Sequence, residues 1–217
     1  MLFFLCENLL SDSNAILKRA YKDRLIQFYV SGSSSQYING SRQLTKPEYA
    51  FDQIDKQYDW CSNCGKHKED HPWIIFNLNN NKMFEINGYY IKSGCCSGTD
   101  GCCCYDEVHY CCECCLFSWS LQISNDNSTW KTVHKVERDY EMRRCRDKTY
   151  KFTETHRAKF IRLIQDEACY DDPPCIAINK IDFIGQIFED GAPLNDYNID
   201  NEDEDVSIIG HISKNKY

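Results

Sequence analysis

Cysteine is the residue type that could support the most chemistry in this chain, because thiolates bind metal ions and pairs of thiols form disulfides. The sequence has 15 cysteines, and nine of them lie between residues 95 and 115. In a reducing compartment, thiolates at this density favour zinc, which takes tetrahedral sulfur or nitrogen ligands. In an oxidising compartment they would form disulfides. A third alternative is a composition-biased insertion without specific chemistry. The candidate zinc ligands in this cluster are Cys111, Cys112, Cys114 and Cys115.

A second group of cysteines has the spacing of half a zinc site. Two residues separate Cys61 from Cys64, and His67 and His71 follow closely enough to complete a tetrahedral set. A thioredoxin-like redox role would need this motif at a helix start in a βαβ unit, and nothing in the sequence suggests one. The alternative is an ordinary surface loop, because a metal motif needs a confirming structural context.

A run of charged residues of mixed sign, residues 137–146, is the third segment with chemical potential. Such a run is usually a solvated loop. It would also suit the rim of a ligand site, where Arg143, Arg144 or Arg146 pairs with an anionic group. Elsewhere we find no nucleophile–base pairing, no phosphate-binding glycine loop and no paired acids. The sequence therefore predicts that the protein is not an enzyme.

The clearest structural element is a hairpin at residues 117–136, which indicates an all-β domain. Apolar residues alternate with polar ones from Phe117 to Ile123, as they do in a strand with one buried face. Residues 125–128 are Asn, Asp, Asn and Ser, whose short side chains bond their own backbone in tight turns. The returning arm begins at Trp130. The hairpin thus has a tryptophan on each arm.

Short apolar runs continue from residue 26 to residue 188 and predict further strands. Many short strands at loop-rich spacing are typical of a sandwich or jelly roll. We expect its four tryptophans to lie in or against the core. Helix-start residues followed by apolar residues at a spacing of four predict a short helical extension within residues 1–27. Residues 189–217 are expected to form a flexible acidic tail.

The formal net charge of −8 is concentrated near the C-terminus. After Phe188, eight acidic residues oppose two lysines, so this segment contributes −6. The remainder has no basic stripe for phosphate contacts, which argues against a nucleic-acid partner. The apolar start of the chain is too short for a signal-peptide core and has no positive charge before it. No segment reaches the roughly 18 apolar residues of a membrane helix. We therefore expect a cytoplasmic protein, with an extracellular location left open.

Several segments, taken in order, resemble the coagulation factor V/VIII type C domain, also called the discoidin or galactose-binding-like domain. The strongest match is Ser118–Trp130, which is similar to the pattern sWxIexSnDgxxW. The segment Trp73–Leu78 resembles W-I-x-F-D-L, with Asn77 in place of the usual aspartate. The ordered set spans about residues 28–188 and is most similar to the divergent copies in protist proteins. The other matching segments are 46–52, 59–62, 86–93, 160–164 and 181–185.

This resemblance implies a discoidin-type jelly-roll β-sandwich at residues 28–188, with the cysteine-rich insertion at 94–115 projecting from it. It also implies a non-catalytic module, since family members bind sugars, anionic phospholipid headgroups or protein surfaces through loops at one end. Loops usually make the ligand contacts, whereas the motifs that identify the family lie in the scaffold. We therefore expect ligand contacts on the rim loops. The candidate contacts are Ser34, Gln36, Tyr37, Asp59, Arg143 and Arg144.

The sequence departs from the family in three respects. No cysteine lies near residue 28 or residue 188, where many secreted members join their ends by a disulfide. Lys180 stands where sugar-binding relatives have a calcium-binding carboxylate. We therefore expect no calcium, an ion that needs about six to eight oxygen ligands. The rim loop 31–37 is polar and lacks the hydrophobic spikes of lipid-binding members, which argues against a membrane partner.

The sequence therefore predicts a recognition module without a cofactor, whose partner is a glycan or a protein. The alternative is a thiol-rich structural protein that holds zinc or is stapled by disulfides at its cysteine clusters. Metal analysis of anaerobically purified protein would separate the two. The oligomeric state has no sequence signal.

Overall fold

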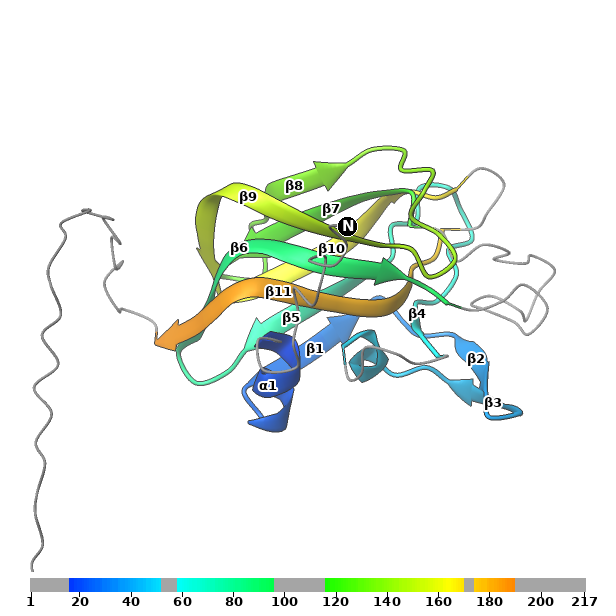
Figure 1. Ribbon diagram of the computed structural model, residues 1–217, viewed down its shortest axis with the longest axis horizontal. Helices are drawn as coiled ribbons and strands as arrows, with labels where there is room; N and C mark the ends of the chain where they lie inside the picture. The colour runs from blue at the N-terminus through cyan, green and yellow to red at the C-terminus, as the bar shows by residue number, and fades with distance from the viewer. Residues whose placement is uncertain (1–15, 52–57, 96–115, 170–173, 190–217) are drawn as a thin grey trace, which may run out of the picture.

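The computed structural model of the chain is a β-sandwich of antiparallel strands (Figure 1). The structure describes residues 16–51, 58–95, 116–169 and 174–189. One sheet has five strands in the order β1-β5-β10-β7-β8, and the other has four in the order β4-β11-β6-β9. Strands β2 and β3 form a separate hairpin. The bounds are β1 (Ile26–Val30), β2 (Ser35–Ile38), β3 (Ser41–Leu44), β4 (Trp60–Cys61), β5 (Trp73–Leu78), β6 (Lys82–Ser93), β7 (Ser118–Ser124), β8 (Lys131–Val136), β9 (Asp147–Ala158), β10 (Phe160–Glu167) and β11 (Ala177–Glu189).

This architecture confirms the predicted all-β jelly-roll sandwich, in which β10 lies between β5 and β7 and β11 lies between β4 and β6. The predicted hairpin is β7–β8, and its turn is held by Asp126. The Oδ1 atom of Asp126 accepts the backbone N–H groups of Ser128 at 2.8 Å and Thr129 at 2.7 Å. A bulge lies at Gly88, where β6 pairs with β9. A Cβ atom at this position would lie 2.3 Å from the carbonyl oxygen of Tyr150, so the bulge needs glycine.

The core lies between the two sheets, and it contains two of the four tryptophans. Trp60 and Trp119 have no exposed surface, as expected. Trp73 and Trp130 are half-buried. Strand alternation in β5 points Trp73 away from the core, because the residue after it is a core residue. The ring of Trp130 lies 4.0 Å from the guanidinium carbon of Arg162, outside the core. The expectation of a core position is therefore wrong for these two.

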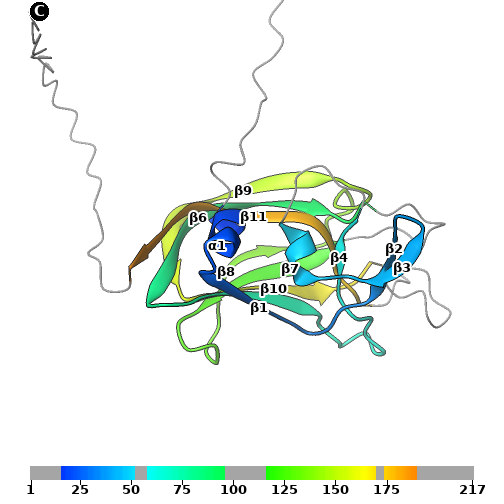
Figure 2. The same cartoon turned by 90° about the horizontal axis from the view of Figure 1, so that it is seen from below.

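Two helical turns close the side of the sandwich where β1 is the edge of one sheet and β4 the edge of the other (Figure 2). Helix α1 (Ile16–Lys22) packs on β11 and β1, and the 3-10 helix η2 (Pro47–Ala50) packs on β11 and β4. The helix predicted within residues 1–27 is thus present. The predicted acidic tail lies outside the described residues, apart from the end of β11. Among the described helices, none is long and apolar enough to cross a membrane.

Two charged side chains of β11 are buried beneath these helical turns. Lys180 is 1% exposed, and its Nζ donates to the carbonyl oxygen of Phe51 at 2.6 Å. Asp182 is also buried, and its Oδ1 accepts the backbone N–H groups of Leu17 at 3.1 Å and Phe183 at 2.8 Å. Burial raises the pKa of Asp182 from 3.8 to about 6. A buried ammonium group thus stands where the resemblance implies a calcium ligand, and the absence of calcium stays a prediction.

Replacing Asp182 with asparagine should flatten the pH dependence of stability. The folded state binds the carboxyl proton more tightly than the unfolded chain does, because the pKa is raised to about 6. The wild-type protein should therefore lose stability as the pH rises from about 4 to about 6, by an amount on the order of 2–3 kcal/mol, and stay at that level above the window. Urea unfolding across this range measures the effect.

The matched variant Asp126→Asn should lose stability between about pH 4 and about pH 6 as the wild-type protein does. It removes an exposed carboxyl whose pKa is lowered by hydrogen bonds from the backbone of Thr129 and Ser128. That carboxyl stabilises the folded state at pH values above its unfolded pKa and loses this effect only below the window. An Asp182→Asn variant with the same slope as the wild-type protein would contradict the assignment.

Candidate ligand-binding site

The longer connections of the sandwich gather at one end, on the right in Figure 1. Strand register places them together, because β1 ends where β5 begins and β10 ends where β7 begins. Short turns join the strands at the opposite end, for example between β5 and β6. We call this region the loop end. Its described residues are 31–34, 62–72, 94–95, 116–117, 137–146, 168–169 and 174–176.

Disulfides tie the loop end together. Cys95, which follows β6, is bonded to Cys145, which precedes β9. Cys61, Cys64 and Cys169 are also disulfide-bonded. All five lie at the loop end or, in the case of Cys61, at the end of β4 that leads into it. Of the three alternatives that the cysteines left open, disulfides are the one found at these positions.

This result changes the interpretation of the predicted zinc half-site. The sulfurs of Cys61 and Cys64 are engaged in disulfides. Zinc needs thiolates, so the predicted set of these two cysteines with His67 is not formed in this state. No group of three His, Cys, Asp or Glu side chains suited to a metal ion occurs in the described part of the chain. Zinc binding by the remaining candidates stays a prediction, because Cys111, Cys112, Cys114 and Cys115 lie outside the described residues.

Two of the predicted ligand contacts, Gln36 and Asp59, are buried side chains that hold the loop end in place. Gln36 is 2% exposed and Asp59 is 0% exposed. The backbone N–H of Asp59 donates to Gln36 Oε1 at 2.8 Å. The Asp59 carboxylate accepts the side-chain amide of Asn179 and the backbone N–H of Cys95, each at 2.9 Å. These bonds join β11 to the segment after β6, and ligand contact by Gln36 and Asp59 stays a prediction.

The other four predicted contacts occupy separate places. The Ser34 hydroxyl is buried and has no hydrogen-bond partner among the described residues. Tyr37 is 47% exposed on the β2–β3 hairpin. Arg143 and Arg144 line a cavity in the connection between β8 and β9. The structure thus brings the two arginines together, and ligand contact by these four residues stays a prediction.

A polar cavity of about 360 Å³ opens at the loop end, where Ser31 of the rim loop meets Cys64 and His71 of the predicted zinc half-site. The sequence did not predict that these two segments form one cavity. Ser31 Oγ donates to Asn63 Oδ1 at 3.2 Å. Asp70 Oδ2 accepts the backbone N–H groups of His67 at 2.9 Å and Lys66 at 2.6 Å, and these bonds lower the pKa of Asp70. The cavity is lined by Ser31, Asn63, Cys64, Gly65, Lys66, Asp70, His71 and Pro72.

A glycine and a histidine shape this cavity further. A Cβ atom at Gly65 would lie 2.6 Å from the Cβ of Asp70, so a larger residue would displace the carboxylate. The ring of His71 is exposed, and its Nδ1 lies 2.9 Å from the carbonyl oxygen of Gln165. Because a carbonyl oxygen only accepts, Nδ1 carries the proton of this hydrogen bond. The cavity wall thus combines carboxylate, amide and imidazole groups.

A second cavity, of about 580 Å³, lies in the β8–β9 connection, and we call it the arginine cavity. Its wall continues into the first residues of β9, Asp147 and Lys148, which no sequence pattern marked. The Nζ atom of Lys148 is held by the carboxylates of Asp139 at 2.7 Å and Glu141 at 3.1 Å. The lining residues are Glu141, Arg143, Arg144, Arg146, Asp147 and Lys148.

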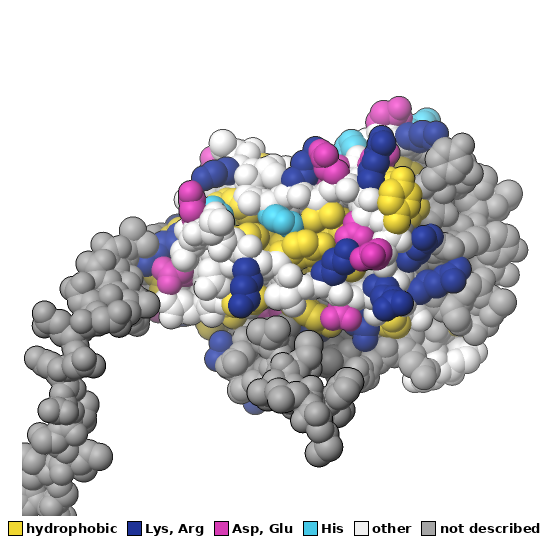
Figure 3. All heavy atoms as spheres, turned by 45° about the horizontal axis from the view of Figure 1, so that its top comes forward, with side chains coloured by type: hydrophobic (Ala, Val, Ile, Leu, Met, Phe, Trp, Pro, Cys, Tyr) yellow, Lys and Arg dark blue, Asp and Glu magenta, His cyan; other side chains and the backbone are white. Residues whose placement is uncertain are grey.

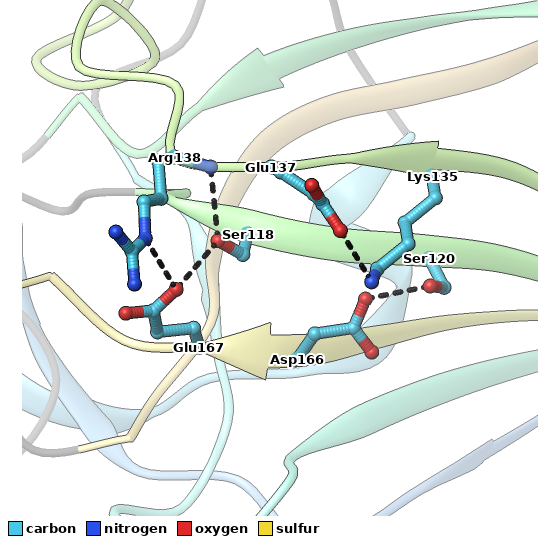
Figure 4. Close-up of polar contacts among 7 residues, drawn as sticks. All are labelled: Ser118, Ser120, Lys135, Glu137, Arg138, Asp166 and Glu167. Carbon is cyan, nitrogen blue, oxygen red and sulfur yellow. Dashed lines mark hydrogen bonds and ion pairs between the residues drawn. The ribbon is translucent and has the colours of Figure 1, made fainter.

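The base of the β8–β9 connection is anchored to neighbouring strands (Figure 4). The backbone N–H of Arg138 donates to Ser118 Oγ at 3.0 Å, and that hydroxyl donates to Glu167 Oε2 at 3.2 Å. The Nε of Arg138 donates to the same carboxylate at 3.3 Å. Farther along, the side chain of Met142 is fully buried, and its carbonyl oxygen accepts the N–H of Leu116 at 2.8 Å. These contacts hold the connection in one position over the end of the sandwich.

The serine–carboxylate pairs in Figure 4 are structural contacts. Ser120 Oγ donates to Asp166 Oδ2 at 2.6 Å, and Ser118 Oγ donates to Glu167. Within the described ranges neither hydroxyl contacts a histidine. A nucleophilic serine needs a base that takes its proton and a third group that orients the base. The arrangement therefore supplies binding groups and no recognisable catalytic set among the described residues.

Comparisons with known proteins identify the fold. No family model and no curated protein matches this sequence. The solved module CpGH89CBM32-5 of Clostridium perfringens, in complex with GalNAc-beta-1,3-galactose, is 13% identical, with a TM-score of 0.50 over 74% of this chain and 95% of that chain. CBM32-3, from a family 31 glycoside hydrolase of the same species, is 13% identical, with a TM-score of 0.54 over 83% of this chain and 100% of that chain.

A third structure contains the CBM32-1, CBM32-2 and M60 catalytic domains of Clostridium perfringens ZmpB. It is 11% identical, with a TM-score of 0.51 over 75% of this chain and 14% of that chain. At these identities the similarity establishes the fold alone. The chain has the jelly-roll sandwich fold of these carbohydrate-binding modules.

Proposed function

We propose that this protein is a non-catalytic carbohydrate-binding module of the discoidin, or factor V/VIII type C, kind, and that it binds a glycan at the loop end. The proposal is supported by the fold, which is shared with a module solved in complex with GalNAc-beta-1,3-galactose. It is also supported by the position of both described cavities, which lie at the end of the sandwich that has the long connections.

The polar cavity is the observation that carries this proposal. Sugar hydroxyls both donate and accept hydrogen bonds, and the cavity offers the amide of Asn63, the carboxylate of Asp70 and the imidazole of His71. Its volume of about 360 Å³ is that of a small-molecule site. The turn uses Oδ2 of Asp70, and no described residue bonds Oδ1. That oxygen can accept a hydroxyl from a ligand.

An exposed tyrosine at the loop end adds an apolar contact surface. Tyr140 is 65% exposed, and its ring packs edge-on against Phe117, with 5.1 Å between the ring centroids. This contact orients the tyrosine ring while most of its surface stays open. The C–H groups on one face of a pyranose ring can pack on such an aromatic surface. Polar groups for the hydroxyls and an aromatic face for the ring are the two components that a sugar site needs.

Asp70→Asn should weaken glycan binding about tenfold or more, because hydrogen bonds to a charged group contribute about 1.5–3 kcal/mol. A glycan array identifies the ligand, and calorimetry then compares the variants. The matched control is Asp126→Asn. Asp126 also accepts backbone N–H groups in an exposed turn, but it lies at the opposite end of the sandwich. The control should bind as the wild-type protein does.

Two results would contradict the proposal. One is an array on which the wild-type protein binds no glycan. The other is an Asp70→Asn variant that is folded and binds with wild-type affinity. Tyr140→Ala provides a second readout, because it removes the aromatic surface and leaves the polar cavity unchanged.

We also infer that the protein works in an oxidising compartment, such as the cell exterior. Disulfides persist there and are rare in the cytosol. This inference departs from the cytoplasmic location that the sequence predicts. Alkylation of thiols in protein from its native source, before any reductant is added, should leave the disulfide-bonded positions unlabelled. Labelling at these positions would place the protein in a reducing compartment. The positions are Cys61, Cys64, Cys95, Cys145 and Cys169.

A further inference from the structure

The arginine cavity concentrates positive charge on a chain whose formal net charge is −8. Four cations and two carboxylates line it. In Figure 3, Lys and Arg side chains are more frequent toward the right of the face shown. Lys148 is already held between the carboxylates of Asp139 and Glu141. The other cations that line the cavity are the three arginines, Arg143, Arg144 and Arg146.

The backbone holds these arginines in a fixed arrangement. The N–H of Arg146 donates to the carbonyl oxygen of Arg143 at 3.2 Å, and the Arg146 carbonyl oxygen accepts the N–H of Ser93 at 2.9 Å. Arg144 and Cys145 both have left-handed backbone conformations, with φ of 51° and 64°. Such conformations are unfavourable for residues other than glycine, and they persist where the surroundings enforce them. The disulfide of Cys145 to the end of β6 supplies that constraint.

The chemistry of the guanidinium group indicates what this cavity can bind. A guanidinium group presents five N–H donors in a plane. Two of these donors match the spacing of two oxygens on a carboxylate or a sulfate. An arginine that already holds one protein partner still has donors for a ligand. The cavity volume of about 580 Å³ lies within the range of about 300–1,000 Å³ that is typical of small-ligand sites.

We propose that the glycan bound at the loop end is acidic and that the arginine cavity binds its charged group, a sulfate ester or a carboxylate. This inference rests on the proposed function and names the ligand class. The exposed ring of Tyr140 is the neighbour in sequence of Glu141, which lines the cavity. One ligand can therefore place its sugar ring on the tyrosine and its acidic group among the arginines.

The test compares three soluble oligosaccharides by calorimetry: one sulfated, one built from uronic acids and one neutral. Arg146→Gln should weaken binding of the preferred acidic oligosaccharide about tenfold or more, because a charge-assisted, bidentate contact is lost. Binding of the neutral oligosaccharide should not change. Arg146→Lys keeps the positive charge but loses the planar guanidinium group. Its affinity for the acidic oligosaccharide should therefore lie between those of the wild-type protein and Arg146→Gln. The double variant Arg143→Gln/Arg144→Gln tests the rest of the cavity.

Arg24→Gln is the matched control. It removes the same charge from an exposed turn before β1, at the end of the sandwich away from the loop end. It should bind all three oligosaccharides as the wild-type protein does. Added salt should weaken binding of the acidic oligosaccharide and leave that of the neutral one nearly unchanged, because ions screen exposed charges. The affinities for the sulfated oligosaccharide and for the uronic-acid oligosaccharide show which anion the cavity prefers.

The outcomes separate this inference from the proposed function. Equal affinity for neutral and acidic oligosaccharides, unchanged in Arg146→Gln, would overturn the acidic ligand and leave glycan binding intact. Binding to none of the three, together with a silent glycan array, would overturn both. Binding to vesicles that contain an anionic phospholipid, without binding to any oligosaccharide, would also overturn both. Such a result would assign the arginines to a lipid headgroup.

Discussion

Removal of the Cys95–Cys145 disulfide should lower the free energy of unfolding by about 2–4 kcal/mol and loosen the loop end more than the sandwich. The variant replaces both cysteines with serine. The bond spans 50 residues of sequence. Without it the unfolded chain gains the conformational freedom of that loop, which the chain-entropy estimate puts at about 4 kcal/mol. Urea unfolding without a reductant measures the loss.

The effect should be local in the folded state. Asp59 still binds the backbone N–H of residue 95, so the sandwich keeps its anchor there. The backbone of residues 143–146 loses the bond that enforces its left-handed segment. Hydrogen exchange should therefore rise in the β8–β9 connection and stay unchanged in the β7–β8 turn at the opposite end. Uniformly faster exchange, or no loss of stability, would show that the disulfide does not organise the loop end.

Trp119→Ala should lower the free energy of unfolding by about 3–5 kcal/mol, the usual loss for truncating a buried tryptophan. Trp119 has no exposed surface, and its Nε1 donates to the hydroxyl oxygen of Tyr89 at 3.0 Å. That hydroxyl also bonds Nδ1 of His134 at 2.9 Å. Burial is the main reason that the pKa of Tyr89 lies far above its ordinary value. The substitution therefore opens a cavity and also removes a hydrogen-bond donor from a buried polar network.

Trp130→Ala is the matched control on the other arm of the same hairpin. It removes the same atoms from a half-buried position, where the ring packs under Arg162. A cation–π contact of this kind contributes about 0.5–1 kcal/mol at exposed sites, so the loss should be much smaller. Thermal and urea unfolding of both variants measure the difference. Equal losses would mean that the two tryptophans are equally buried, contrary to the structure.

Local patterns were enough to predict the longer strands, while the short strands β2, β3 and β4 were not predicted. The alternation from Phe117 to Ile123 correctly predicted a strand, but not that only one of its faces is buried, since Ser118 and Ser120 are buried as well as Trp119 and Leu121. The helix within the first 27 residues was predicted from its start residues and spacing. Each of these features depends on residues close together in sequence, because strand and helix periodicity come from backbone geometry. The ordered motifs then indicated how the strands are arranged.

The candidate site was predicted less well. Gln36 and Asp59 lie in segments that the sequence presents as polar loops, and in the structure both are buried. The reason is a partner far away, since Asn179 is 120 residues from Asp59. Cys61 and Cys64 could bind zinc only as free thiolates, and in the structure both are disulfide-bonded. The spacing of these cysteines in the sequence does not show whether their sulfurs are bonded. The polar cavity was missed because it combines Ser31 with residues 63–72, which are far from it in sequence.

The sequence by itself determined the longer strands, the all-β class and the unequal distribution of charge, because these follow from the order of neighbouring residues. The tertiary structure decided which tryptophans are buried, which polar residues are structural and where the cavities lie. Ser31 and Asn63, for example, are 32 residues apart and meet at one cavity. Packing of segments distant in sequence determines whether a side chain meets solvent or another chain segment. The binding surface is therefore a property of the folded loop end.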